Sequence, residues 1–243
     1  MIVKTEAVVL KTAKQGDTSK IASLYTDSHG LISVIAKGAR NTKSKFGSAL
    51  EPLSIDEITF YHKPSTELYL LSNADSTGKI RKLQSNSEYL IHGLMIAETI
   101  MNTQAKHSPN AELSFILKES LNELNRASCD PFVIFAAFLL KFTNEMGFAP
   151  EIEMLFDISP LEHITVSLQN GCSCIHRSDK TIQLTAGSYS IINQINELSY
   201  ESLEGLNLNF NQRLEVFSFL VRYISYHFDK RFVLKSAGLL NYG

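Results

Sequence analysis

VKTEAVVLKTAKQGDTSKIASLYTDSHGLISVIA, Val3 to Ala36, is the stretch that decides how the chain folds. Runs rich in β-branched residues alternate in it with two turn signals, QGDT and DSHG, and the glycine of the second turn can take a positive φ. The stretch therefore predicts three short strands. Two more are expected in LSIDEITFYH, Leu53 to His62, and in ELYLLS, Glu67 to Ser72. Five strands in about eighty residues are the content of a small barrel such as an OB-fold, with a sandwich fragment as the alternative.

Beyond residue 85 the hydrophobic period becomes that of helices. The first helix has Ser85 or Ser87 as a possible cap and places Leu90, Leu94, Ala97 and Met101 on one stripe. The second is expected to begin with Ser108 as cap and Pro109 at its first position, and the third repeats this arrangement with Asp130 and Pro131. Three helices with short connections indicate a bundle.

The helical period disappears between about 151 and 186, where HITVSLQ and KTIQLT predict two strands around the turn QNGCSC. Two more helices follow, in SIINQINEL and NFNQRLEVFSFLVRYISYHF. The sequence therefore predicts an α+β protein. Its expected parts are a five-stranded N-terminal barrel (1–82) and a helical-bundle domain (83–243) with a hairpin insertion at about 151–186.

Composition limits the class of protein. The chain has 243 residues, of which 44% are hydrophobic, so it can build packed cores. Its longest apolar run, Phe132 to Leu140, is too short to span a bilayer, and the opening segment has no secretory pattern. Three cysteines are too few for a disulfide framework. We expect a cytoplasmic protein that does not contact a membrane.

Charge is distributed unevenly along a chain whose formal net charge is −2. Residues 1–82 hold twelve Lys or Arg against eight Asp or Glu, whereas residues 83–243 are acidic overall. The densest basic segment is KGARNTKSKFG, Lys37 to Gly47, which we call the basic loop. Such a segment is suited to track a phosphate backbone, because neutralised phosphates release counterions. The predicted DNA contacts are Lys37, Arg40, Lys43 and Lys45, extended by Lys11, Lys14 and Lys20, with Phe46 either stacking on a base or anchoring the loop. The alternative is a solvated surface loop.

Patterns for catalysis are missing from the sequence. Neither a P-loop nor a G-x-S-x-G nucleophile elbow occurs, and the seven histidines lack metalloprotease spacing. Asp56 and Glu57 are adjacent in a predicted strand and so point to opposite faces, which argues against a nuclease built on that pair. We therefore expect no enzymatic turnover and no small-molecule substrate.

A cysteine and histidine cluster, Cys172-x-Cys174-x-His176, is the one metal-like pattern in the chain. Structural zinc normally takes four ligands, with two to four residues between paired cysteines. This cluster offers too few ligands at a poor spacing. A plain turn is the expected structure, and no metal is expected there.

The ordered motifs of residues 5–52 resemble the N-terminal domain of the RecO family of bacterial DNA repair and recombination proteins. That family typically has a T-E-A-hydrophobic-V-L strand, a G-[DE]-x-[DS] turn, an HG turn and an A-K-G-A-R segment with a basic stretch ending in F-G. The resemblance continues more weakly through GFAPE, Gly147 to Glu151, and YHFDKRFVLKS, Tyr226 to Ser236. Matching positions in the first part are Thr5, Glu6, Ala7, Val9, Leu10, Gly16, Asp17, His29, Gly30, Ala36, Lys37, Gly38, Ala39, Arg40, Phe46, Gly47, Leu50 and Pro52.

The resemblance implies an OB-fold followed by a helical domain. It also implies a recombination mediator, associated with the nucleoid, that binds single- and double-stranded DNA. Such a mediator anneals strands coated with single-stranded DNA-binding protein (SSB) and helps RecR load RecA. Many members carry two cysteine pairs that bind zinc. Here Leu155 and Ile158 stand near the expected positions of the first pair. The resemblance therefore predicts a degenerate zinc-finger region without the metal.

The helical half is expected to bind proteins. In the family, SSB ends in an acidic, hydrophobic tail, which suits an apolar groove with a few cations. The candidate contacts are Arg222, Lys230, Arg231 and Lys235, close to Phe228 and Phe232. Cations at this place can instead complement the dipole of the last helix. A pure protein-interaction scaffold, whose barrel does not bind DNA, is the alternative function.

Overall fold

The protein is described by a computed structural model that covers residues 1–46, 49–77, 80–155 and 158–242. The chain divides into two compact units, Met1–Asn125 and Arg126–Gly243, here called the first and the second unit. The first unit joins the N-terminal strands with two long helices. The expected domain boundary after residue 82 stays a prediction.

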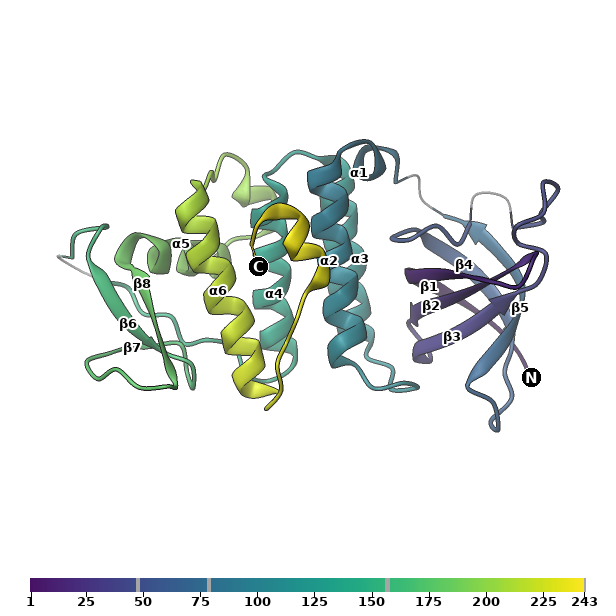
Figure 1. Ribbon diagram of the computed structural model, residues 1–243, viewed down its shortest axis with the longest axis horizontal. Helices are drawn as coiled ribbons and strands as arrows, with labels where there is room; N and C mark the ends of the chain where they lie inside the picture. Colours follow the sequence, from purple (N-terminus) through teal and green to yellow (C-terminus); the bar gives the residue numbers. More distant parts are fainter. Residues whose placement is uncertain (47–48, 78–79, 156–157, 243) are drawn as a thin grey trace. The chain divides into compact units, whose positions relative to one another are not determined.

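A closed five-stranded barrel forms the N-terminal part of the first unit (Figure 1). The strand order is β1-β2-β3-β5-β4, and β4 pairs back to β1, so that all neighbours are antiparallel except β3 and β5. This barrel confirms the predicted OB-fold arrangement of strands. The strands are β1 (Ile2–Gln15), β2 (Ser19–Thr26), β3 (Gly30–Ala36), β4 (Ile55–Tyr61) and β5 (Leu68–Ser76).

The barrel core follows from the alternation of side chains along each strand. Leu24, Ile32, Val34 and Phe60 point inward and are buried, while their chain neighbours face outward. The two turns that the sequence marks, after β1 and after β2, contain Gly16 with φ +55° and the start of β3. Turn residues and alternation together set the strand boundaries.

Helices α1 (Arg81–Ser85), α2 (Ser87–Thr103) and α3 (Ala111–Arg126) follow the barrel. The two longer helices begin at asparagines rather than at the expected serines. The Asn86 side chain accepts from Glu88 N at 2.9 Å, and the Asn110 side chain accepts from Leu113 N at 2.9 Å. The expected caps at Ser85 or Ser87 and at Ser108 are therefore wrong by one or two residues. Asparagine and serine are about equally good N-cap residues, so their ranking does not choose between neighbours in the sequence.

Close contacts hold the connection between α2 and α3 against the turn between β2 and β3. His107 N donates to Leu31 O at 3.1 Å, and Gly30, with φ +61°, lies so close that an added Cβ would stand 2.3 Å from Ser108 O. On α3, Lys118 Nζ lies 2.7 Å from Glu6 Oε2 and 3.0 Å from Asp27 Oδ2. A backbone hydrogen bond, the close approach of Gly30 and two ion pairs thus join the barrel to helices α2 and α3 and their connection.

The second unit combines helices with a small sheet. Asp130 and Pro131 begin its first helix as expected, because the Asp130 side chain accepts from Phe132 N at 2.9 Å. The predicted hairpin is a three-stranded sheet of order β7-β6-β8, since two residues of the QNGCSC turn pair with β6. The elements are α4 (Pro131–Glu145), β6 (His163–Ser167), β7 (Ser173–Cys174), β8 (Thr181–Thr185), α5 (Ala186–Glu197), η1 (Tyr200–Leu203), α6 (Phe210–His227) and η2 (Lys235–Leu240). The chain thus has the predicted α+β class.

Candidate nucleic-acid interface

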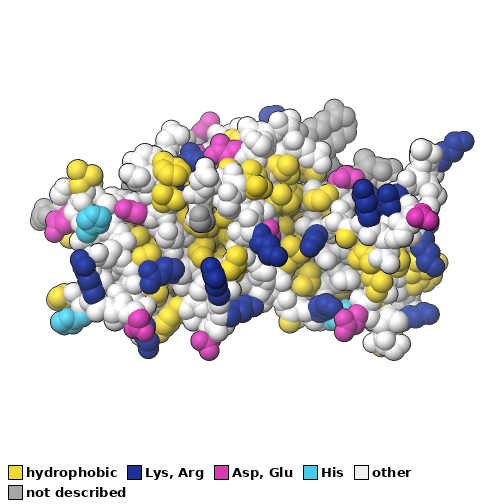
Figure 2. Space-filling model, viewed as in Figure 1, with side chains coloured by type: hydrophobic (Ala, Val, Ile, Leu, Met, Phe, Trp, Pro, Cys, Tyr) yellow, Lys and Arg dark blue, Asp and Glu magenta, His cyan; other side chains and the backbone are white. Residues whose placement is uncertain are grey.

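The basic loop leaves the barrel directly after β3. It projects from the end of the barrel in Figure 1, and the side chains of Lys37, Arg40, Lys43 and Lys45 are exposed. Figure 2 shows Lys and Arg side chains on this part of the surface, including its projecting tip. Gly47, the last residue of the loop, lies outside the described residues.

Arg40 fixes the basic loop to the turn between β1 and β2. Its backbone N donates to Thr18 O at 2.9 Å, and its Nη1 donates to Gly16 O at 2.9 Å. The same turn joins Lys14 to Lys20, which lie opposite each other in the β1–β2 register. The fold therefore brings the loop cations and the two strand-end lysines to one end of the barrel, as a shared DNA surface requires.

These cations differ in how freely they can meet a phosphate. Lys20 is held by Glu51, with 3.0 Å between Nζ and Oε1, and Lys45 Nζ donates to Ser72 O. Among the described residues no ion-pair partner is seen for the exposed residues Lys11, Lys14, Lys37 and Lys43.

Phe46 lies inside the barrel end and is only 3% exposed. It belongs to the same apolar core as Val34 and Phe60, and Lys45 Nζ stands 5.2 Å from its ring centroid. A buried ring does not offer a face to a nucleobase. Of the two expected roles for Phe46, the geometry favours anchoring of the basic loop over base stacking.

A buried carboxylate holds the limb that returns from the loop to β4. Leu50 has a left-handed φ of +65°, and its N donates to Asp56 Oδ2 at 2.8 Å. Asp56 is fully buried, and this burial raises the pKa of its carboxyl group, although the Leu50 bond opposes the shift. Its neighbour Glu57 lies on the opposite, outer face and pairs with Lys4 at 2.7 Å. The two acids therefore do not converge on a metal ion, in line with the alternation of the strand.

The outer face of the barrel beside the basic loop carries a row of apolar side chains. Ile21, Ile35, Leu70, Tyr61 and Ile2 are successive cross-strand partners around the barrel. Figure 2 shows hydrophobic side chains gathered on the barrel surface. The sequence alone did not reveal this row, because its members come from strands far apart in the chain.

Two further rows of the outer face differ in charge. Lys11 lies opposite Ser23, which lies opposite Ser33, so one row is polar and basic. Elsewhere on the outer face Glu6, Glu57 and Asp75 are cross-strand partners in β1, β4 and β5. Carboxylates repel a phosphate backbone. The electrostatics therefore favour approach of an anion along β1–β2–β3 and the basic loop.

The residues at the expected zinc positions do not form a zinc site. Cys172 Sγ donates to Glu151 O at 3.1 Å, and Cys174 Sγ lies 3.7 Å from His176 O. Leu155 and Ile158 supply no donor atoms. No group of three or more metal-binding side chains lies together among the described residues. The donor set therefore does not fit a four-ligand zinc site.

A direct link joins the two segments that bear these positions. The Tyr189 hydroxyl donates to Gly171 O at 3.0 Å and accepts from Glu153 N at 3.0 Å. Tyr189 is buried, and burial raises the pKa of its phenol. The hydroxyl therefore holds the segment after GFAPE against the turn that contains Cys172.

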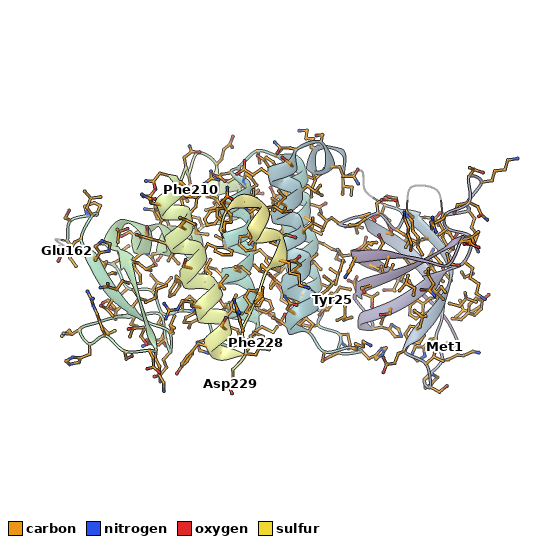
Figure 3. All side chains as sticks on the ribbon, viewed as in Figure 1. Met1, Tyr25, Glu162, Phe210, Phe228 and Asp229 are labelled. Carbon is orange, nitrogen blue, oxygen red and sulfur yellow. The ribbon has the colours of Figure 1, made fainter. Side chains whose placement is uncertain are left out.

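The expected protein-binding cations lie around α6 and beyond its end. Arg222 Nη2 donates to Thr181 O at 3.1 Å, and Lys230 Nζ stands 5.5 Å from the Phe228 ring centroid. Phe228 and Asp229 mark the end of α6 in Figure 3. Arg231 and Lys235 are exposed, whereas Phe232 is buried at 2%. The apolar member expected at Phe232 is therefore not available to a partner.

A pocket of about 250 Å³ lies between α4 and α5, away from those four cations. Lys141 contributes its one charged side chain and stands 4.0 Å from the Tyr200 ring centroid. Sequence reasoning missed this pocket, although a lysine within the apolar run of α4 was a visible signal. The lining residues are Ala137, Leu140, Lys141, Asn144, Ala149, Ile195, Asn196 and Leu198.

The helices were compared with the length and hydropathy of a membrane span. Within the described part of the chain, none of them combines the length and the hydropathy that a bilayer crossing needs.

Family models match both parts of the chain. The model described as "Recombination protein O N terminal" matches residues 1–79, and "Recombination protein O C terminal" matches residues 84–236. The first match contains the whole barrel, the basic loop and the row of outer-face side chains.

Several relatives named DNA repair protein RecO are similar to the chain. The protein of Thermoanaerobacter sp. (strain X514) is 25% identical over 246 residues, which cover 99% of this chain and 97% of the relative. That of Chlorobium phaeobacteroides (strain DSM 266) is 30% identical over 203 residues, or 82% and 77% of the two chains. The Salinibacter ruber protein is 32% identical over 152 residues, so that the match spans only 58% of its length. With its barrel, its basic loop and both family models in sequence order, the chain belongs to the recombination protein O (RecO) family.

Proposed function

We propose that this chain acts in DNA repair and homologous recombination as a mediator that binds single- and double-stranded DNA and anneals complementary strands. The observation that carries the proposal is the exposed basic loop fixed to the β1–β2 turn of an OB-type barrel. Membership of the RecO family supports the biological role.

The mechanism follows from electrostatics. Two strands repel each other through their phosphates, and a cationic surface lowers that repulsion by replacing condensed counterions. Lys37, Lys43 and Arg40 would contact one strand, and Lys14 extends the track along the barrel end. The bases would lie toward the apolar row of β2, β3 and β5. Nucleotide hydrolysis is not needed for this step, and we propose that the protein works without turnover and without zinc.

Protein partners complete the proposal. As implied for the family, they are RecR and the C-terminal tail of SSB. The pocket between α4 and α5 suits an acidic, hydrophobic tail such as that of SSB. Its walls are mostly apolar, and Lys141 adds a positive charge to the lining. The contacts expected at Arg222, Lys230, Arg231 and Lys235 stay a prediction.

Fluorescence anisotropy of a labelled single-stranded oligonucleotide over a salt series tests the DNA surface. We expect the variant with Lys37, Arg40, Lys43 and Lys45 changed to Ala to bind more weakly. Its slope of log K against log salt should be shallower by about 3, because each lost single-strand contact removes about 0.7.

A charge-preserving variant, in which the three lysines become Arg and Arg40 becomes Lys, is the matched control and should keep the wild-type slope. Unchanged affinity in the alanine variant would reduce the loop to a solvated segment and favour a protein-interaction scaffold. Cleavage of the labelled DNA in magnesium or manganese would contradict the absence of turnover.

A further inference from the structure

Annealing sets a requirement that the basic loop alone does not meet. A protein that pairs two strands must hold the second while the first is bound. The second unit is acidic along much of its sequence, yet three exposed cations lie in or beside one of its turns. This inference rests on the annealing activity proposed above.

The turn between β7 and β8 presents two of these cations on a braced backbone. Arg177 and Lys180 are both exposed. Between them Ser178 N donates to Thr181 Oγ1 at 3.0 Å, Thr181 Oγ1 donates to Ser178 O at 2.8 Å, and Lys180 N donates to Ser178 Oγ at 3.2 Å. Lys180 O also accepts from Leu168 N at 2.9 Å, which ties the turn to the segment after β6. These hydrogen bonds brace the part of the turn from Ser178 to Thr181.

The third cation comes from a different element and is fixed beside the turn. Arg222 on α6 is exposed, and its Nη2 donates to Thr181 O, the residue directly after Lys180, at 3.1 Å. One guanidinium nitrogen is used in this bond, so other N–H groups of Arg222 stay available to an incoming oxygen. Figure 2 shows Lys and Arg side chains over the sheet and α6 of this unit.

The local charge is positive. Within the described residues Arg177, Lys180 and Arg222 have no carboxylate partner, and Asp179 is the acid of the turn itself. His176, also exposed, precedes the group. None of these residues lines the pocket between α4 and α5. The segment 177–181 contains only polar residues, and its separated cations match the spaced oxygens of a phosphate backbone better than the apolar end of a peptide.

We propose that Arg177, Lys180 and Arg222 form a second polyanion surface that takes the second DNA strand during annealing. Three single-strand phosphate contacts correspond to a salt slope of about −2, which is a roughly 20-fold loss of affinity between 50 and 200 mM salt. The second strand is thus held more weakly than the first and leaves readily as duplex.

The test loads the full-length protein onto a tethered single-stranded oligonucleotide that accommodates one molecule. A differently labelled, non-complementary strand is then titrated at several salt concentrations. We expect the wild type to retain the second strand. R177A/K180A/R222A should bind it at least about 10-fold more weakly, anneal more slowly, and hold the first strand within about 2-fold of wild type. R177K/K180R/R222K keeps the charge at the same three positions and should behave as wild type.

Several outcomes would overturn the inference. They are an unchanged ternary complex in the triple variant, an equal loss in the control, a wild type that never takes a second strand, and an equal weakening of both strands. Capture of an acidic, hydrophobic peptide that depends on the three cations, with second-strand binding intact, would assign the surface to a protein partner instead. Failure of the wild type to bind the first strand contradicts the proposed function. A wild type that binds the first strand but not the second contradicts only this inference.

Discussion

At the level of single residues, Asp56 shows how the barrel supports its basic loop. Its carboxylate lies in the core and accepts a hydrogen bond from the backbone N–H of Leu50. The left-handed conformation of Leu50 lets the chain turn back toward β4. The sequence predicted the alternation of Asp56 and Glu57 but not which of the two is buried. A strand with acids at adjacent positions carries no signal for that choice until its neighbours are known.

Replacement of Asp56 separates its hydrogen bond from its charge. Asp56→Leu should lower the free energy of unfolding by about 1–3 kcal/mol, because the buried Leu50 N–H loses its acceptor. Asp56→Asn keeps an acceptor without the charge and should be at least as stable as wild type at pH 7. Urea unfolding measures both variants, and equal stability of the Leu variant and the wild type would contradict the role of the hydrogen bond.

The raised pKa of Asp56 also predicts how the stability of the wild type, compared with Asp56→Asn, depends on pH. The folded protein binds this proton above the ordinary value of 3.8, at a pH where the unfolded chain has lost it. The group therefore adds stability as pH falls through the folded pKa toward 3.8. Any advantage of Asp56→Asn over wild type at pH 7 should shrink as the pH is lowered through that window.

At the level of elements, the strands were more predictable than the helices. Alternating side chains and two clear turns predict the barrel strands. The helix starts were predicted at nearby serines, but the caps are Asn86 and Asn110. The stripe expected on α2 was also misplaced. Ala97 is buried, but Met95, Ile96 and Ile100 are buried in place of the other three expected residues. A helix with apolar residues on most sides does not reveal its face through periodicity.

Gly30 explains why the HG turn matters to the packing of elements. Gly30→Ala should cost more than about 2 kcal/mol, because it combines a left-handed φ with a Cβ that would stand 2.3 Å from Ser108 O. Gly16→Ala is the matched control, since Gly16 has φ +55° with nothing within 4 Å of its Cβ, and it should cost only the backbone strain of about 1 kcal/mol. Urea unfolding compares the two variants. Equal losses would mean that close approach to the α2–α3 connection is unimportant.

At the level of the whole molecule, the order of the motifs along the sequence was enough to indicate the family. The surfaces of the protein could be recognised only from the folded structure. The basic loop was visible because its cations lie within nine consecutive residues, 37–45. The apolar row, the pocket beside Lys141 and the cluster around Arg222 are assembled from separate segments, and register or helix packing alone brings their members together. Phe46 could not be assigned to core or surface from its neighbours in sequence.

Removal of metal should leave the whole molecule unchanged, because the Tyr189 hydroxyl joins the segments around Glu153 and Gly171 through its own hydrogen bonds. Dialysis against EDTA should shift neither the melting temperature nor the DNA affinity, and elemental analysis should find far less than one zinc per chain. Tyr189→Phe, which removes that link, should by contrast destabilise the protein by about 1–3 kcal/mol. A melting temperature that falls with EDTA and recovers with added zinc would contradict this account.

The ion pair between Lys118 and Glu6 also has a consequence during synthesis of the chain. Glu6 is made early, and the cation that neutralises it lies 112 residues further along the chain. At about 5–20 residues per second, roughly 6 to 20 s pass before Lys118 is synthesised. During that interval the nascent barrel carries Glu6 and Asp27 without this counter-charge. The barrel strands are thus synthesised before the helix whose lysine pairs with these two carboxylates.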